Sequence, residues 1–161
     1  MERLSGESDG RDEIDQVLFE ATSFNESDAQ VSPDGRWVAY TSDESGKNRV
    51  YVRPFPGPGG KTPISIESGQ EPRWSRDGRE LFYRDPDKNQ LMAVDVQTSP
   101  AFRAGQPHAL FALGNVPWDA APGGKRFLVV KEPESSAGEA KMQAVVNWFE
   151  ELRQKAPAGK K

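Results

Sequence analysis

The side chains in this sequence that could carry out catalysis are few, and they are not grouped at the spacings that catalysis requires. His108 is the single histidine, and it follows Pro107 with no serine or aspartate placed as in a catalytic triad. The chain contains no cysteine, which excludes disulfides, thiolate metal sites and cysteine nucleophiles together. We therefore assign His108 a structural or surface role, and we expect no catalytic residue and no enzymatic activity in this chain.

Two short segments are similar to ligand-binding loops but lack residues that such loops need. Segment 56–62 (PGPGGKT) ends like a phosphate-binding loop, yet Phe55 stands where the first glycine of that motif belongs. Segment 85–90 (DPDKNQ) begins like a calcium loop, but Gln90 replaces the glycine at position six and Val96 replaces the glutamate at position twelve. We therefore predict a hairpin turn at 85–90, no metal site and no cofactor.

The composition excludes two classes of partner and favours an all-β fold. Acidic residues number 25 against 21 basic ones, so the net charge of -4 provides no field that would attract nucleic acid. The apolar runs are far shorter than the ~20 residues of a membrane helix, and the charged start MERLSGESDGRDE is unlike a signal peptide. Only 35% of the residues are hydrophobic, while 15 glycines and 13 prolines are spread along the chain. Such a composition favours short strands and many turns over helices.

A repeat of a little over 40 residues is the strongest signal in the sequence. Three segments share it: 29–55, 72–96 and, more weakly, 120–134. The turn glycines that anchor the three copies are 43 and 46 positions apart: Gly35, Gly78 and Gly124. A fixed period of this length is typical of propeller blades or solenoid units. We therefore interpret each copy as one small antiparallel sheet.

Each copy begins with a short strand, a tight turn and a strand of aromatic and β-branched residues. Asp34 and Asp77 each precede a turn glycine, so we interpret them as turn formers in separate sheets and not as a catalytic carboxylate pair. The second strands are predicted at 37–40, 80–83 and 126–129. Their consecutive apolar residues predict burial on both faces, between neighbouring sheets. Third strands are predicted at 50–52 and 91–94, and outer strands at 62–66 and 108–112.

Counting strands predicts three four-stranded antiparallel blades of a β-propeller. One strand, 15–21, precedes the first repeat, and the third repeat ends after a third strand at 143–148. In a closed propeller an N-terminal strand often completes the last blade. We therefore predict a disordered tail at 1–13, a three-blade region at 14–152 and a charged tail at 153–161.

Three blades are fewer than the ~4 to 8 that close a propeller, so apolar blade faces would stay open to water. One hypothesis is self-association through these faces: two chains form a six-bladed ring, and each lends its first strand to the third blade of its partner. The alternative is that a longer chain supplies the missing blades. Both remain open at the level of the sequence.

Over residues 14–152 the repeats resemble those of TolB-type, WD-repeat-like β-propellers. The runs 28–46, 50–60 and 147–152 together are most similar to the C-terminal propeller that follows a serine/threonine kinase domain in some soil bacteria. The third repeat departs from the family pattern, because Gly123 stands where an aspartate is usual. The resemblance implies a sensor or scaffold region associated with a bacterial kinase, and a location in the periplasm or at the cell surface.

The tryptophans divide into core positions and one candidate for binding. Trp37 and Trp74 lie in repeat strands and are predicted to pack between blades, and Trp148 is predicted to anchor the last strand. Trp118 precedes the innermost strand of the third repeat, where a loop would face the mouth of the central channel. Three charged residues are expected at the same mouth, which gives a predicted partner-binding surface of Asp28, Glu71, Arg73 and Trp118.

The sequence therefore predicts a non-catalytic module that binds a protein or peptide through the loops of a rigid propeller. Kinase activity is excluded from this chain, because it has no HRD loop, no DFG motif and no glycine-rich nucleotide loop. One alternative is the propeller gate of a prolyl-oligopeptidase-like hydrolase, whose GxSxG elbow is not in this sequence. The other is a structural unit whose whole role is self-assembly.

Overall fold

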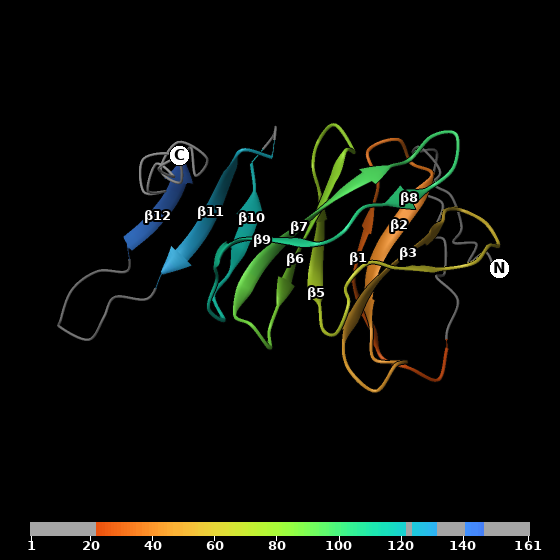
Figure 1. The fold of residues 1–161 in the computed structure, drawn as a ribbon, viewed down its shortest axis with the longest axis horizontal. Coiled ribbons are helices and arrows are strands. Elements are labelled where there is room, and N and C mark those ends of the chain that lie inside the picture. Colours follow the sequence, from red (N-terminus) through yellow and green to blue (C-terminus); the bar gives the residue numbers. More distant parts are fainter. Residues whose placement is uncertain (1–21, 122–123, 132–140, 147–161) are drawn as a thin grey trace, which may run out of the picture.

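The computed structural model describes residues 22–121, 124–131 and 141–146, with only the backbone for 131 and 141–146. Within these ranges every regular element is a β-strand, and the strands form three antiparallel sheets that lie side by side (Figure 1). The first sheet contains β1 (Glu26–Val31), β2 (Trp37–Ser42), β3 (Arg49–Pro54) and β4 (Thr62–Pro63). The second contains β5 (Gln70–Trp74), β6 (Glu80–Asp85), β7 (Gln90–Gln97), β8 (Arg103–Ala104) and β9 (His108–Ala112). The third contains β10 (Trp118–Ala120), β11 (Arg126–Lys131) and β12 (Lys141–Val146).

The structure confirms an all-β fold of antiparallel sheets and differs from the prediction in how the outer strands are built. The second sheet has five strands, because β7 is eight residues long and pairs with β8 at its end and with β9 at its start. Strand β4 covers two residues of the predicted 62–66 segment, and Pro63 has no N–H with which to extend the ladder. The predicted strand at 15–21 and both predicted tails lie outside the described residues.

The turn between the first and second strands is built in the same way in the first two repeats. Ser32 Oγ donates to Asp34 Oδ1 at 2.6 Å, and the same oxygen accepts the Arg36 N–H at 3.2 Å. Ser75 and Asp77 repeat this arrangement, with a hydroxyl-to-carboxylate distance of 2.8 Å. The turn glycines all have positive φ, at 72° for Gly35, 69° for Gly78 and 66° for Gly124. The third repeat thus keeps the left-handed glycine.

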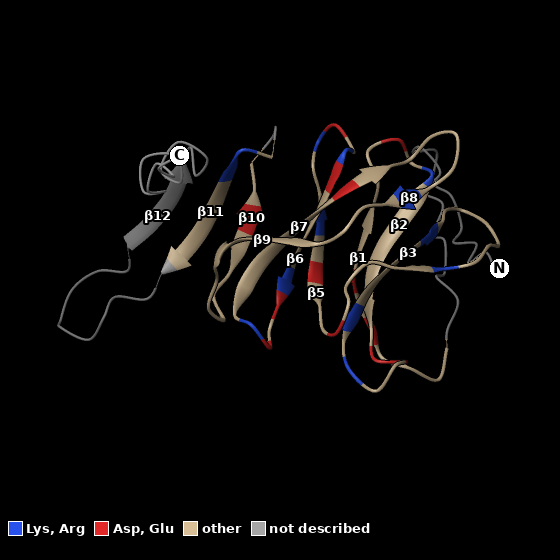
Figure 2. Ribbon diagram, viewed as in Figure 1, with Lys and Arg blue, Asp and Glu red and all other residues tan. Residues whose placement is uncertain are grey.

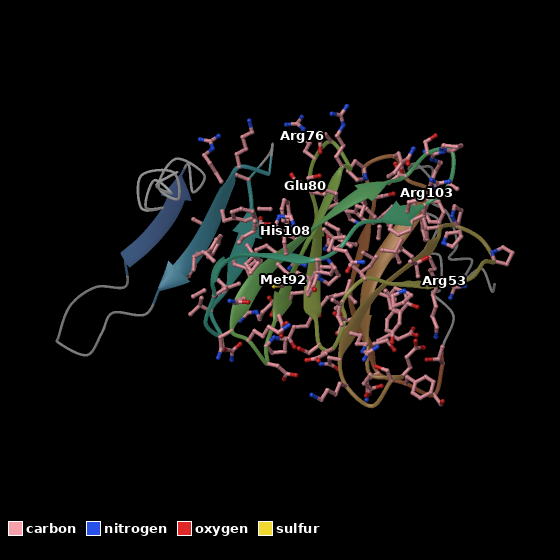
Figure 3. All side chains as sticks on the ribbon, viewed as in Figure 1. Arg53, Arg76, Glu80, Met92, Arg103 and His108 are labelled. Atoms are coloured by element: carbon pink, nitrogen blue, oxygen red, sulfur yellow. The ribbon has the colours of Figure 1, made fainter. Side chains whose placement is uncertain are left out.

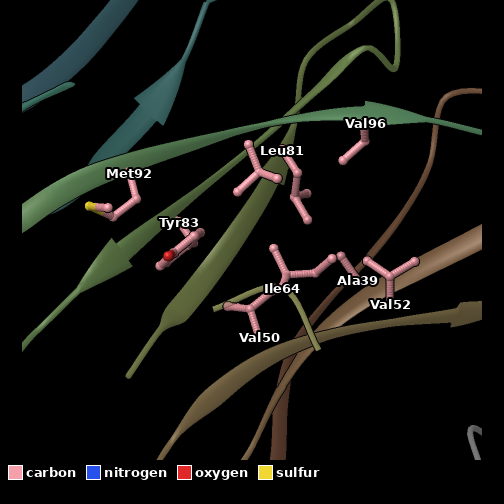
Figure 4. Packing of buried hydrophobic residues seen from close by; sticks show 9 residues of the cluster. Ala39, Val50, Val52, Ile64, Leu81, Tyr83, Met92 and Val96 are labelled. Carbon is pink, nitrogen blue, oxygen red and sulfur yellow. The ribbon is translucent and has the colours of Figure 1, made fainter. Parts of the chain in front are cut away.

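The hydrophobic core forms two layers, one on each face of the second sheet. The first layer lies between the first and second sheets (Figure 4) and contains Ala39, Val50, Val52, Ile64, Leu81, Tyr83, Met92, Val94 and Val96. The second lies between the second and third sheets and contains Phe82, Leu91, Ala93, Leu113, Trp118, Phe127 and Val129. Successive residues of β6 and β7 alternate between the two layers, as expected where side chains alternate across a strand. The consecutive apolar residues of 80–83 therefore do line both faces.

Three aromatic contacts show how closely the sheets pack. The Phe82 and Phe127 rings meet edge to face across the second layer, with centroids 5.0 Å apart. In the first layer Trp37 and Trp74 are half-buried and both lie against Phe102, at 5.2 and 6.4 Å between ring centroids. Both tryptophans therefore pack between the first two sheets. No helix among the described residues is long and apolar enough to cross a bilayer.

Candidate functional site

A pocket of about 480 Å³ opens where the innermost strands β1, β5 and β10 of the three sheets meet. Its lining residues come from all three sheets: Asp28, Glu71, Arg73, Arg84, Asn115, Val116, Pro117 and Trp118. All four residues of the predicted binding surface are among them. The structure thus brings these four together, and their binding role stays a prediction.

Two of the lining residues, Asp28 and Glu71, have a backbone conformation that side chains other than glycine rarely adopt. Their φ angles are 56° and 55°, and each lies at a β-bulge where the pairing with the second strand shifts. Each is seven positions before its turn glycine. Pro117 has the same position in the third repeat, where the proline ring fixes φ at a negative value. Of these three equivalent positions, only the two acidic ones therefore have the left-handed backbone.

Asp28 and Glu71 are linked by Thr41 of the second strand β2. Thr41 Oγ1 donates to Asp28 Oδ2 at 3.1 Å, and the Glu71 N–H donates to Thr41 Oγ1 at 3.2 Å. Ser27 Oγ donates to the same Asp28 oxygen at 3.1 Å. Because Thr41 belongs to the first sheet and Glu71 to the second, this short chain of hydrogen bonds fixes the two sheets to each other at the pocket.

Arg84, 43 positions after Thr41, makes the corresponding link between the second and third sheets. Its Nη2 atom donates to Glu71 Oε2 at 3.0 Å, and its Nη1 atom donates to Gly114 O at 2.8 Å and to Asn115 Oδ1 at 3.1 Å. Arg84 Nη2 also contacts the Val116 carbonyl oxygen. The residue is 3% exposed, so this cation is held almost entirely by protein acceptors. Its Nε atom is buried without a hydrogen-bond partner.

Trp118 has a mainly structural position within the pocket wall. Its indole Nε1–H donates to Glu71 Oε2 at 2.8 Å, and its ring belongs to the second core layer. Only 7% of the residue is exposed. Most of the Trp118 side chain is therefore buried in the core, and a ligand can contact only the part that lines the pocket.

Arg73 is the cation that the pocket leaves available. Its guanidinium carbon lies 5.9 Å from the centre of the Trp118 ring, a cation–π geometry, and its Nη1 atom donates to the carbonyl oxygen of Pro72 at 2.9 Å. Among the described residues no carboxylate is within ion-pair distance of Arg73. Among the described residues the pocket therefore contains one ion pair, Glu71–Arg84, and two charged groups without an ion-pair partner, the Arg73 cation and the Asp28 carboxylate.

The other residues that the sequence analysis considered for catalysis or metal binding lie outside the pocket, in turns or on exposed strands. His108 is exposed on β9 (Figure 3). Asp34 and Asp77 lie in separate turns, and the residues after Asp85 form the turn between β6 and β7. There Asp85 Oδ1 accepts the Ser68 hydroxyl at 2.7 Å and two backbone N–H groups at 3.1 and 3.2 Å. Among the described residues no group of three or more histidines and carboxylates is placed to hold a metal ion.

Sequence reasoning missed Arg84, Asn115, Val116 and Pro117. The repeat carried a signal for Arg84, because a residue 43 positions after Thr41 occupies the same place in its sheet. Pro117 carried one as well, because it lies seven positions before Gly124, as Asp28 and Glu71 do before their glycines, whereas Asn115 and Val116 carried none. Charges of both signs lie on adjacent strands around this region (Figure 2), which agrees with the small net charge of the chain.

Comparison with known proteins supports the fold. No family model matches the chain. Over 92 residues, or 52% of this chain, the sequence is 34% identical to dipeptidyl aminopeptidase BI of Pseudoxanthomonas mexicana, and the match covers 13% of that protein. The crystal structure of TolB from Acinetobacter baumannii is similar with a TM-score of 0.53 at 16% identity, over 78% of this chain and 31% of TolB. The chain thus spans less than a third of either protein, and its sheets have the arrangement of a TolB-like β-propeller.

Proposed function

We propose that this chain is a non-catalytic recognition module that binds a protein or peptide in the pocket between β1, β5 and β10. The observation that carries this proposal is the equivalent placement of Asp28 and Glu71, two non-glycine residues at positive φ in the wall of one pocket. Such strained backbone persists only where the surroundings enforce it, and it concentrates at ligand sites. A rigid rim of this kind can present polar groups at low entropic cost.

The lining of the pocket suits a polar, chain-like ligand. A volume of about 480 Å³ falls in the range of ligand sites, and the lining combines charged groups with the apolar Val116, Pro117 and Trp118. The lining residues include no Ser, Thr, Cys, Lys, Tyr or His that could act as a nucleophile beside a base, and the Glu71 carboxylate is paired with Arg84. These features support recognition as the role of the pocket.

Selection of peptides from a displayed library on the immobilised chain tests this proposal. Arg73→Gln changes the pocket. Arg103→Gln on β8 (Figure 3) is the matched control, because Arg103 is exposed and is not among the lining residues of the pocket. We expect selected peptides to bind the unmodified chain and Arg103→Gln equally, and to bind Arg73→Gln at least about tenfold more weakly. Equal binding to both variants would show that recognition occurs elsewhere.

The same module could form a closed ring with a second copy. The fold comparison supports a propeller, and β11 carries Phe127 and Val129 into the core while Leu128, on its other face, is 40% exposed. Two chains of three blades would give a six-bladed ring in which this face is covered. The resemblance to kinase-linked propellers adds a role as the sensor or scaffold of a bacterial kinase.

The match to a dipeptidyl aminopeptidase favours a second candidate, in which the chain belongs to the propeller of a larger hydrolase and controls access to its active site. Mass spectrometry of the endogenous polypeptide separates the two. A product that also contains a serine hydrolase domain supports the gate, and a product that contains a kinase domain supports the sensor.

A further inference from the structure

Some charged side chains of the pocket have an ion-pair partner and others have none, and the unpaired ones indicate which chemical groups a ligand should carry. Glu71 and Arg84 neutralise each other at 3.0 Å, and the Arg84 side chain is 4% exposed. Asp28 receives hydroxyl hydrogen bonds from Ser27 and Thr41 on one oxygen. Arg73 has no anionic partner among the described residues, although it is half-buried. A half-buried cation without a counter-ion attracts an anionic group.

The Arg73 guanidinium is also held in place before a ligand arrives. It lies over the Trp118 ring at 5.9 Å, and Trp118 is itself fixed by its bond to Glu71 and by the core around it. One of its five N–H donors is used on the Pro72 carbonyl oxygen, which leaves four. Because the fork is planar and oriented, it can receive a carboxylate with two parallel hydrogen bonds at little entropic cost.

Asn115 supplies a second, neutral donor. Its Oδ1 atom accepts a hydrogen bond from Arg84 at 3.1 Å, which assigns the orientation of the amide. The amide NH₂ group therefore points away from Arg84, and it has no acceptor among the described residues. Asn115 is exposed and lines the same pocket. Two donor groups, one charged and one neutral, thus belong to one cavity.

Resting on the recognition function proposed above, we infer that the ligand presents a carboxylate to Arg73, with the Asn115 amide as the second donor. The free oxygen of Asp28 accepts an N–H group of the same ligand, which favours a peptide over a simple anion. The carboxylate comes from an acidic side chain or from the C-terminus of the peptide. Either source has the same chemistry, so the experiment must separate them.

Three capped peptides serve as probes: N-acetyl-Ala-Glu-Ala-amide, N-acetyl-Ala-Ala-Ala with a free C-terminus, and N-acetyl-Ala-Gln-Ala-amide. Each is titrated to about 10 mM into the ¹⁵N-labelled full chain, and the indole resonance of Trp118 is followed. We expect one or both of the carboxylate peptides to shift this resonance at concentrations at least about tenfold lower than the glutamine peptide. The acid that binds more tightly identifies the source of the carboxylate.

Variants of Arg73 and a control complete the test. Arg73→Gln should abolish the preference for a carboxylate, Arg73→Lys should keep part of it because the charge remains without the fork, and Arg103→Gln should leave it unchanged. The inference is wrong if the glutamine peptide binds as tightly as both acids, if none of the three shifts Trp118, or if Arg73→Gln keeps the preference. The recognition function is judged separately by whether the library selection, which admits peptides of any charge, yields peptides that bind the chain.

Discussion

At the scale of single residues, the pocket depends on a few side chains that each serve two neighbours. Thr41 connects Asp28 with the backbone of Glu71, and Arg84 connects Glu71 with the loop before β10. Both residues occupy the same place in their repeats, so one position of the second strand joins each sheet to the next. The pocket wall is therefore part of the contact between sheets, and changes there affect stability as well as binding.

Replacement of Arg84 by methionine tests this dual role. The substitution leaves the Glu71 carboxylate without its cation and three loop acceptors without a donor, and we expect it to lower the free energy of unfolding by ~2–4 kcal/mol. Removing the charge of its partner as well, in Arg84→Met/Glu71→Gln, should recover part of the loss. Urea denaturation followed by tryptophan fluorescence measures both. A single variant within about 0.5 kcal/mol of the unmodified chain would contradict the assignment.

At the scale of elements, the second strand of each of the first two sheets has hydrogen-bonding polar side chains at both of its ends. A Ser-x-Asp-Gly turn precedes the strand, and residues at its end, Ser42 and Asp85, bond the N–H groups of the turn that follows. Both sets of polar side chains accept hydrogen bonds from backbone N–H groups that would otherwise have no partner at the end of a buried strand. The Asp-Gly pairs in the sequence predicted the turn before the strand. The role of Ser42 and Asp85 at the end of the strand is seen only in the structure.

The turn carboxylates make the stability of these elements dependent on pH. The Ser75 hydroxyl and the Arg79 backbone N–H hold the pKa of Asp77 below its ordinary value of 3.8. Because the folded pKa is lower than the unfolded one, the stabilisation is complete above pH ~5 and is lost as the pH falls through the folded pKa. We expect Asp77→Ala to cost ~1 kcal/mol at pH 6 and less at the acid end of the range, where protonation weakens the hydrogen bonds to the carboxyl.

Urea denaturation of the unmodified chain and Asp77→Ala between pH 6 and pH 2.5 measures this difference. Asp77→Asn is the control, since it keeps an acceptor oxygen but cannot titrate. It should retain part of the stability at pH 6, without the added acid sensitivity that the charge of Asp77 contributes. A difference between the unmodified chain and Asp77→Ala that stays constant over this range would refute the role given to the carboxylate.

At the scale of the whole molecule, the features that recur in every repeat could be predicted from the sequence, and the features that differ between repeats could not. The all-β fold, the strands buried on both faces and the grouping of Asp28, Glu71, Arg73 and Trp118 all follow from superposing one repeat on the next. The fifth strand of the second sheet depends on the length of β7, and the β-bulges at Asp28 and Glu71 depend on long-range pairing. Neither the fifth strand nor the bulges produce a pattern in the local sequence, because both depend on which strand pairs with which.

The state of association decides whether the molecule completes its propeller with a second copy. If two chains form one ring, sedimentation should give twice the 17.8 kDa mass of the chain, and Leu128→Lys should shift the population to monomer by placing a charge in the covered face. Ala112→Lys on β9 is the control, because Ala112 is exposed and belongs to the second sheet, whose two faces are already covered within one chain. A well-folded monomer at high concentration would rule out pairing. Because β11 already has one face in the core, its other face stays open unless another sheet covers it, which makes Leu128 the most direct probe of closure.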